Sequence, residues 1–166
     1  MKLTLERPWL VADLGAPLRV LSWSLTKPGF VEARRIVWRE VRNADLPVDL
    51  DAEAWLRAEL AASGHAEAVA FLTSRDIRRV SHISHETEGV RAEAVATVGL
   101  SNAERVGQRR ALPQGPGTIN IALELSTPMT DAALIEALSL AVEARTAAVL
   151  EYGPRVATGS ATGTGT

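Results

Sequence analysis

The sequence predicts a single layered domain of the α+β or α/β class, with a mixed central β-sheet and flanking helices. Three observations predict it: strand-like runs outnumber helical ones, both hairpin-like and crossover connections join them, and no long period repeats along the chain. The 166 residues suit one domain, which we place at 1–166. A chain of this length can bury a sizeable core, so it needs no disulfide or metal in order to fold.

The N-terminal part of the chain reads as strands. Apolar or alternating patterns predict them over residues 3–5, 9–13 and 18–24. The stretch Lys27-Pro28-Gly29-Phe30 indicates a turn. The next run, 32–41, fits a helical face, but its β-branched residues and the preceding turn favour a strand.

Caps and glycines define the middle of the chain. Asp51 can cap a helix that runs to Ala62. The apolar run 68–73 predicts a short buried strand, and 74–85 predicts a helix that Gly89 breaks. Strands are then expected over 90–100 and 118–125, with a polar loop over 102–116 between them.

The clearest helix is predicted over 131–152. Thr130 can accept a hydrogen bond from a first-turn amide, and Asp131 favours the positive end of the helix dipole. The last segment, 157–166, alternates glycine and threonine and reads as a strand lead-in, an anion-binding turn or a flexible tail. No strand or helix comes after it to bury it, so we expect a C-terminal strand and helix to be missing and the domain to be truncated within this segment.

Composition excludes several classes of protein. The net charge is −2 and basic residues are mixed with acidic ones, so no basic surface is expected to bind nucleic acid. Cysteine is absent, which excludes disulfides and thiolate chemistry and agrees with the cytoplasmic location that we expect. The most apolar run, 132–150, carries charges, so we expect no membrane span. We expect no metal site, because the histidines form no convincing ligand cluster.

Two turn motifs at the ends of strands carry the candidate chemistry. They read Gly99-Leu100-Ser101-Asn102-Ala103 and Pro116-Gly117-Thr118-Ile119-Asn120. The sequence leaves open whether Ser101 and Asn102 form an ordinary turn, or whether Asn102 donates to a substrate carbonyl beside Ser101 as a nucleophile or second donor. Rigid strand ends are where sites are usually built.

Asn120 and Glu143 are the other candidates. Asparagine is disfavoured inside an apolar strand, so Asn120 must find a partner in the backbone or in a ligand, and Thr118 shares its face. Glu143 lies in a nearly uncharged stretch, and we expect it to be partly buried, with a raised pKa that suits a general base or acid. The alternative is that Glu143 forms a salt bridge or lies on a solvated stripe. Thr146 is expected to share the face of Glu143.

The chain resembles the adenosylcobinamide amidohydrolases of corrinoid salvage. The resemblance lies in four segments in family order: the two turn motifs, Glu143-Ala144-Arg145-Thr146-Ala147-Ala148 and Ala161-Thr162-Gly163-Thr164-Gly165-Thr166. Looser matches are Leu21-Ser22 with Gly29, and Phe71-Leu72-Thr73 with Asp76-Ile77. The family usually has lysine where Arg145 stands, and after its Thr-Gly-Thr segment it normally continues with an Asp, a strand, a Gly-His-Thr motif and a helix.

The resemblance implies a hydrolase of a linear, non-peptide amide. Its members cleave the amide between the corrin ring and aminopropanol in adenosylcobinamide, giving adenosylcobyric acid for cobalamin salvage. It implies no cofactor of the protein's own, since the cobalt belongs to the substrate. It also implies a small-molecule corrinoid as partner, and it leaves homo-oligomerisation open. A corrinoid-binding module without hydrolysis and an oligomeric structural domain are the alternatives.

The roles that the resemblance suggests are hypotheses about nine residues. As catalytic residues we expect Ser101, Asn102, Asn120 and Glu143. The two asparagines would polarise the carbonyl, and Glu143, or a residue of the missing C-terminal part, would act as the base. As substrate-binding residues we expect Ser22, Thr118, Thr146, Thr162 and Thr164.

Overall fold

The computed structural model describes residues 1–108 and 117–164, which form two sheets, two α-helices and two short ribbons. The first sheet is mixed and has the order β1-β2-β3-β4. Its strands are β1 (Lys2–Glu6), β2 (Trp9–Trp23), β3 (Pro28–Glu40) and β4 (Val69–Thr73). The second sheet is antiparallel, with the order β5-β6-β8, and consists of β5 (Ser81–Thr87), β6 (Val90–Val98) and β8 (Ile119–Leu125).

The remaining elements are helices and two-residue strands. The helices are α1 (Ala52–Ala62), α2 (Asp131–Tyr152) and the short 3₁₀ turns η1 (Asn43–Asp45) and η2 (Ile77–Arg79). One ribbon pairs β7 (Ala103–Glu104) with β11 (Gly163–Thr164), and the other pairs β9 (Arg155–Val156) with β10 (Gly159–Ser160). This is an α+β fold in layers, with a mixed sheet, as predicted.

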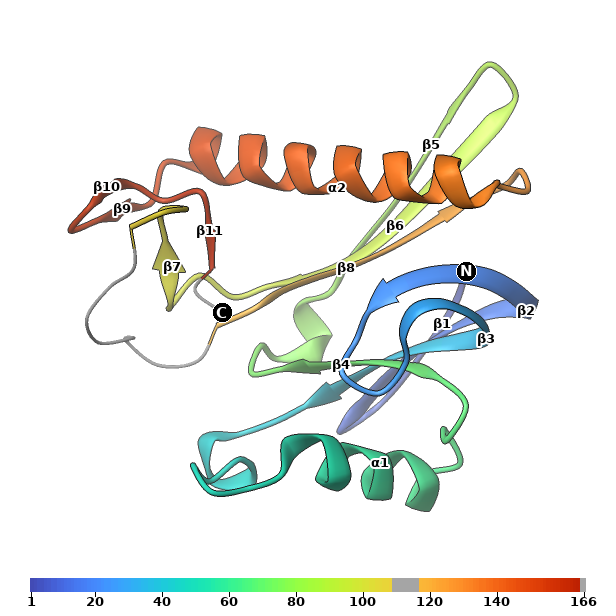
Figure 1. Ribbon diagram of the computed structural model, residues 1–166, viewed down its shortest axis with the longest axis horizontal. Helices are drawn as coiled ribbons and strands as arrows, with labels where there is room; N and C mark the ends of the chain where they lie inside the picture. Colours follow the sequence, from blue (N-terminus) through green and yellow to red (C-terminus); the bar gives the residue numbers. More distant parts are fainter. Residues whose placement is uncertain (109–116, 165–166) are drawn as a thin grey trace.

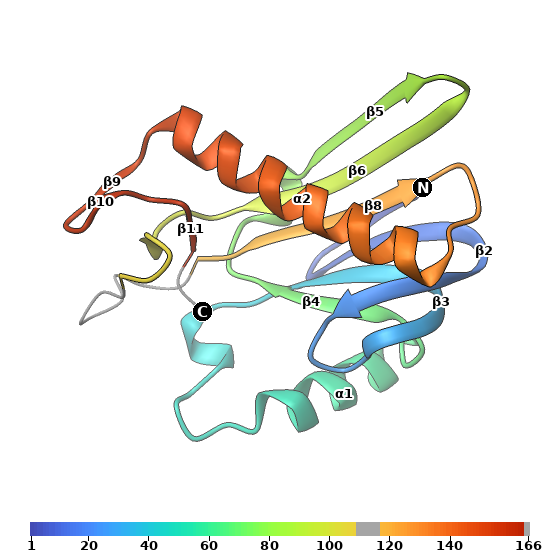
Figure 2. The same cartoon turned by 45° about the horizontal axis from the view of Figure 1, so that its top comes forward.

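The layers pack around two apolar clusters. Side chains such as Leu10, Trp38 and Val95 fill the space between the two sheets and are almost completely buried. The opposite face of the mixed sheet is covered by α1, through Leu56 and Leu60. The helices α1 and α2 lie on opposite sides of the molecule, with the sheets between them (Figure 1, Figure 2). No helix in the described part of the chain is both long and apolar enough to cross a membrane.

The helix predictions for α1 and α2 are confirmed, caps included. Asp51 accepts a hydrogen bond from the Ala54 amide at 3.0 Å, and Thr130 accepts one from the Ala133 amide at 3.2 Å. Gly153 ends α2 in a left-handed conformation (φ 75°) that glycine adopts without strain.

Two strand predictions in the N-terminal part are corrected. The runs 9–13 and 18–24 belong to one long strand, β2, which is interrupted by a bulge between Asp13 and Leu18. The turn expected at 27–30 falls earlier, and β3 already begins at Pro28. The Ser24 amide donates to the Ser22 hydroxyl, and the Lys27 amide donates to the Ser24 hydroxyl, which closes the turn before Pro28.

The helix predicted over 74–85 is wrong. Only η2 is helical there, capped by Asp76, and the chain then runs into β5. β5 and β6 form a hairpin through Glu88 and Gly89, which both have positive φ (51° and 77°). Two such residues make the tight turn that joins antiparallel strands, so Gly89 turns a hairpin rather than breaking a helix.

Candidate functional site

The two sheets meet where the edge strands β4 and β8 approach each other. β4 and β8 each end the strand order of their sheet. The Asn120 Nδ2 group of β8 donates to the Leu72 carbonyl of β4 at 2.8 Å, and lies 3.4 Å from the Thr118 hydroxyl. Asn120 therefore has the buried backbone partner that its place in an apolar strand demands.

The two turn motifs pack directly against each other next to this junction. The Gly99 amide donates to the Thr118 carbonyl at 2.8 Å and extends the pairing of β6 with β8. A Cβ atom on Gly117 would lie 2.5 Å from Asn102 Oδ1 and 2.9 Å from Ser101 Oγ, so only glycine fits there. Asn102 and Ser101 thus contact the glycine turn of the second motif.

An apolar hollow of about 540 Å³ lies beneath α2. Its walls come from α2, from β8 and from the mixed sheet, with Leu138, Ile121 and Phe71 as examples from each. Arg19, one of its lining residues, makes a two-pronged ion pair with Asp131 at 2.6 and 2.8 Å, which fastens the first turn of α2 to β2. We call this space the apolar hollow.

A second hollow, of about 460 Å³, is lined mostly by polar and charged residues and lies at the other end of α2. The ribbon of β7 and β11 forms one side of it, where the Thr162 amide donates to the Glu104 carbonyl at 2.8 Å and Thr162 Oγ1 accepts from the Val106 amide at 2.8 Å. Its polar lining consists of Glu104, Arg105, Gln108, Arg145, Thr146, Thr162 and Thr164. We call it the polar hollow.

Arg145 stands at the wall between the two hollows. Among the described residues, only Arg145 and Val142 line both. Arg145 is half-buried, and its Nε is buried without a hydrogen bond to any residue in the described part of the chain. A Cβ on Gly163 would lie 3.9 Å from Arg145 Nη2, so the guanidinium lies beside the backbone of Gly163, which also lines the polar hollow. A desolvated donor without a partner is what a site for an oxyanion or carbonyl oxygen requires.

The structure brings together some of the predicted site residues and separates others. Thr146, Thr162 and Thr164 share the polar hollow, while Ser22 and Asn120 line the apolar hollow. Ser22 is held by the Ser24 amide, which donates to its hydroxyl at 2.9 Å. Thr118 contacts Asn120. Ser101 and Asn102 lie at the Gly117 turn and line neither of these two hollows.

The expectation that Glu143 is partly buried is wrong. Its side chain is exposed, and it lines neither of the two hollows. The inward stripe of α2 follows the spacing of Val142, Arg145, Thr146 and Val149, and Glu143 lies about 60° beyond the edge of this stripe, which Thr146 forms. Thr146 therefore does not share the surroundings of Glu143, and the burial on which the predicted role as a base rested is absent.

Glu104 is the carboxylate of the polar hollow, and sequence reasoning missed it. It lies in the predicted polar loop, where nothing local distinguishes it. Its place depends on the pairing of β7 with β11, two segments almost sixty residues apart. In the described ranges, no group of three or more acidic, histidine or cysteine side chains could hold a metal ion.

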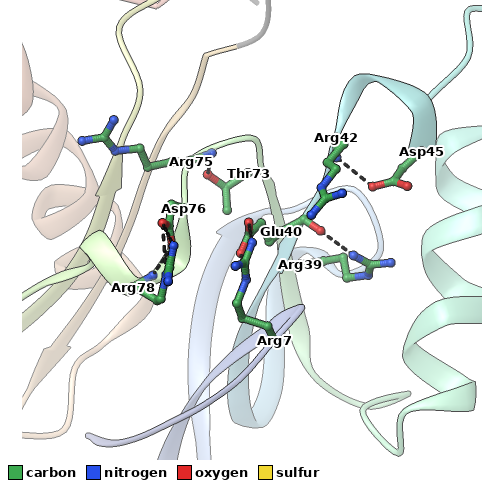
Figure 3. Close-up of polar contacts among 9 residues, drawn as sticks. All are labelled: Arg7, Arg39, Glu40, Arg42, Asp45, Thr73, Arg75, Asp76 and Arg78. Atoms are coloured by element: carbon green, nitrogen blue, oxygen red, sulfur yellow. Dashed lines mark hydrogen bonds and ion pairs between the residues drawn. The ribbon is translucent and has the colours of Figure 1, made fainter.

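A cluster of ion pairs surrounds the end of β4 (Figure 3). Arg78 binds Asp76 at 2.7 Å, and this contact holds the pKa of Asp76 far below its ordinary value. Arg7 pairs with Glu40, and the Arg39 guanidinium donates to the Glu40 carbonyl. The Arg7–Glu40 pair joins the β1–β2 turn to the end of β3, while the Arg78–Asp76 pair stays within the connection after β4. We therefore assign these contacts to holding the local backbone around the end of β4.

The comparison with known families gives a match along the full sequence. A family model described as adenosylcobinamide amidohydrolase matches residues 1–166, the whole chain. The comparisons with curated proteins and with solved structures give no match.

Proposed function

Because the chain belongs to the adenosylcobinamide amidohydrolase family, we propose that it hydrolyses the amide between the corrin ring's propionyl arm and aminopropanol. The products are adenosylcobyric acid and 1-amino-2-propanol, and the acid can re-enter cobalamin synthesis, which makes the reaction a salvage step. The protein needs no cofactor of its own in this proposal, since the cobalt belongs to the substrate.

The observation that carries the proposed site is the position of Arg145. Amide hydrolysis moves negative charge onto the carbonyl oxygen, and a positive donor held in a water-poor wall stabilises that charge. Arg145 offers such a donor at the junction of the two hollows. Asn120, the sequence-based candidate for this role, already donates from its Nδ2 group to Leu72. We therefore assign the carbonyl oxygen to Arg145.

Glu104 is our candidate for the proton transfers. It lines the same polar hollow as Arg145. A carboxylate there can accept a proton from the attacking water as the water oxygen bonds to the carbonyl carbon. The same proton then passes to the nitrogen as the C–N bond breaks, and the amine leaves neutral while the acyl part keeps the new carboxylic group. In this proposal Glu104 takes the role that the sequence suggested for Glu143.

The test is a product assay on the purified protein. Incubation with adenosylcobinamide should release 1-amino-2-propanol. The remaining corrinoid should show the mass expected when water is added and aminopropanol is lost, so that a carboxylic acid replaces the amide. An absorbance shift of the corrinoid without a mass change would contradict hydrolysis and favour a corrinoid-binding module. Neither a shift nor a product would contradict both and favour the oligomeric structural domain.

A further inference from the structure

We infer that the polar hollow is the subsite of the leaving amine and that it selects amines that carry a hydroxyl group. The inference rests on the proposed amide hydrolysis and deepens it, because it states which half of the substrate each hollow receives. Its starting point is the contrast between two hollows that share Arg145 and Val142.

The position of Arg145 divides the substrate. If the reacting carbonyl oxygen lies at Arg145, the acyl part and the amine part extend to opposite sides of it. One side is the apolar hollow, walled by side chains such as Leu138 and Ile121, and the other is the polar hollow. A hydroxyl buried among aliphatic side chains would lose its hydrogen bonds with water and gain none. The hydroxyl-bearing amine therefore belongs on the polar side, and the methylene groups of the propionyl arm belong on the apolar side.

The polar hollow offers complementary partners for a hydroxyl. Thr146, Thr162 and Thr164 each carry a hydroxyl that can donate and accept, and Glu104 adds acceptor oxygens. Thr162 Oγ1 already accepts from the Val106 amide at 2.8 Å, so its own hydrogen is directed elsewhere as a donor. These groups come from α2 and from the β7–β11 ribbon, so they approach a ligand from two sides.

The expected selectivity comes from unpaired groups. A site built to bind a hydroxyl leaves its own polar groups without partners when an analogue lacks that hydroxyl. The hollow is partly open to water, which will satisfy some of them. We therefore expect a loss of about tenfold in kcat/KM, far below the roughly 10⁴-fold of an enclosed site built to bind a hydroxyl.

The test compares two amides of the same corrinoid that differ only in one hydroxyl: adenosylcobinamide, which is the 2-hydroxypropyl amide, and its propyl amide. The unmodified protein should prefer the hydroxypropyl amide by about tenfold in kcat/KM. Thr146→Val and Thr164→Val keep the side-chain shape and remove a hydroxyl, and they should bring this ratio towards one. Ser139→Ala, on the exposed side of α2, is the matched control and should keep the ratio.

A second measurement needs no variant. 1-Amino-2-propanol should inhibit the hydrolysis at roughly tenfold lower concentration than 1-aminopropane, because it fills the same subsite. Equal rates on the two amides together with equal inhibition by the two amines would overturn the inference and leave the proposed hydrolysis intact. Hydrolysis of neither amide would overturn the proposed function, and the inference with it.

Discussion

The Asn120 side chain donates to the Leu72 carbonyl oxygen at 2.8 Å and so links the edge strands of the two sheets. Asn120 lies within one motif of the family resemblance, and Leu72 lies within another. The bond also fixes β8 relative to β4, and residues of both strands line the apolar hollow. A single carboxamide thus couples the packing of the sheets to the shape of the site.

Replacing Asn120 with alanine should therefore affect stability first. Asn120→Ala leaves the Leu72 carbonyl without its partner, and we expect the free energy of unfolding to fall by about 1–3 kcal/mol. Urea unfolding followed by circular dichroism measures it. If turnover drops while the unfolding curve stays in place, the carboxamide acts on the substrate and the structural role is refuted.

Arg145 should matter far more to catalysis than Glu143. Arg145→Met should lower kcat by about 10²- to 10³-fold, the usual loss when one oxyanion donor is removed. Arg145→Lys keeps the charge but loses the planar guanidinium, so its kcat should lie between that of the unmodified protein and that of Arg145→Met. Steady-state rates on adenosylcobinamide measure both.

Glu143→Gln is the matched comparison for that series. Its side chain is exposed and lines neither hollow, so we expect the rate to stay within about twofold of the unmodified protein, as for most surface substitutions. A loss in Glu143→Gln as large as that in Arg145→Met would restore the sequence-based hypothesis and argue against Glu104 as the base.

Gly163 offers a probe of the space in front of Arg145. The methyl group of Gly163→Ala would lie at ordinary contact distance, 3.9 Å, from Arg145 Nη2, and Gly163 does not adopt positive φ, so the fold should persist. We expect kcat/KM to fall roughly tenfold, because the methyl group would push a substrate at Arg145 out of place, and a small misplacement of the reacting group is costly. Thermal melting alongside the assay separates the two effects. An unchanged rate would show that the substrate does not approach Arg145 beside Gly163.

The acid limb of the stability curve should depend on Glu93. The Met1 ammonium, bound at 2.7 Å, and His82 hold the pKa of Glu93 below its ordinary value of 4.5, against burial, which raises it. A lowered folded-state pKa stabilises the protein above about pH 4.5 and stops doing so as the pH falls through the folded value. The difference in unfolding free energy between the unmodified protein and Glu93→Gln should therefore shrink as the pH falls below 4.5. A difference that is constant from pH 7 to pH 3 would contradict this.

The Met1 ammonium should give the opposite pH dependence, with stability lost as the pH rises. Burial lowers the pKa of the Met1 ammonium, but its bonds to Glu124 and Glu93 outweigh that effect and raise the pKa above 8.0. A raised pKa stabilises the folded state below that value, and the contribution disappears as the pH rises through the folded pKa. The Glu124→Gln protein should therefore have a lower free energy of unfolding than the unmodified protein near neutral pH, and this difference should shrink at high pH. The same unfolding series measures it.

The predictable parts of the fold are those with local causes. The caps Asp51 and Thr130 and the glycine at 153 lie next to the helices that they delimit, so the bounds of α1 and α2 can be read from neighbouring residues. β5 escapes prediction because Asp76 resembles a helix cap, while the hairpin that defines the strand depends on positive φ at Glu88. Whether strands join one sheet or two is decided by packing between distant segments, which no local pattern contains.

The site residues also divide into those that local sequence indicates and those that depend on distant segments. The sequence indicated Thr146, Thr162 and Thr164, and these do converge on one hollow. Glu104 was beyond reach, since its place depends on the pairing of β7 with β11. The prediction for Glu143 fails because a charge in an apolar helix stretch need not be buried, and its angular position on α2 exposes it.

The narrow wall between the hollows has a practical consequence. Since Val142 and Arg145 are the only described residues common to both, the remaining lining of each hollow can be varied on its own. Substitutions around Leu138 should alter which acids the enzyme accepts, and substitutions around Thr164 which amines. The two preferences are then separable traits, open to independent engineering in libraries that leave the dividing wall intact.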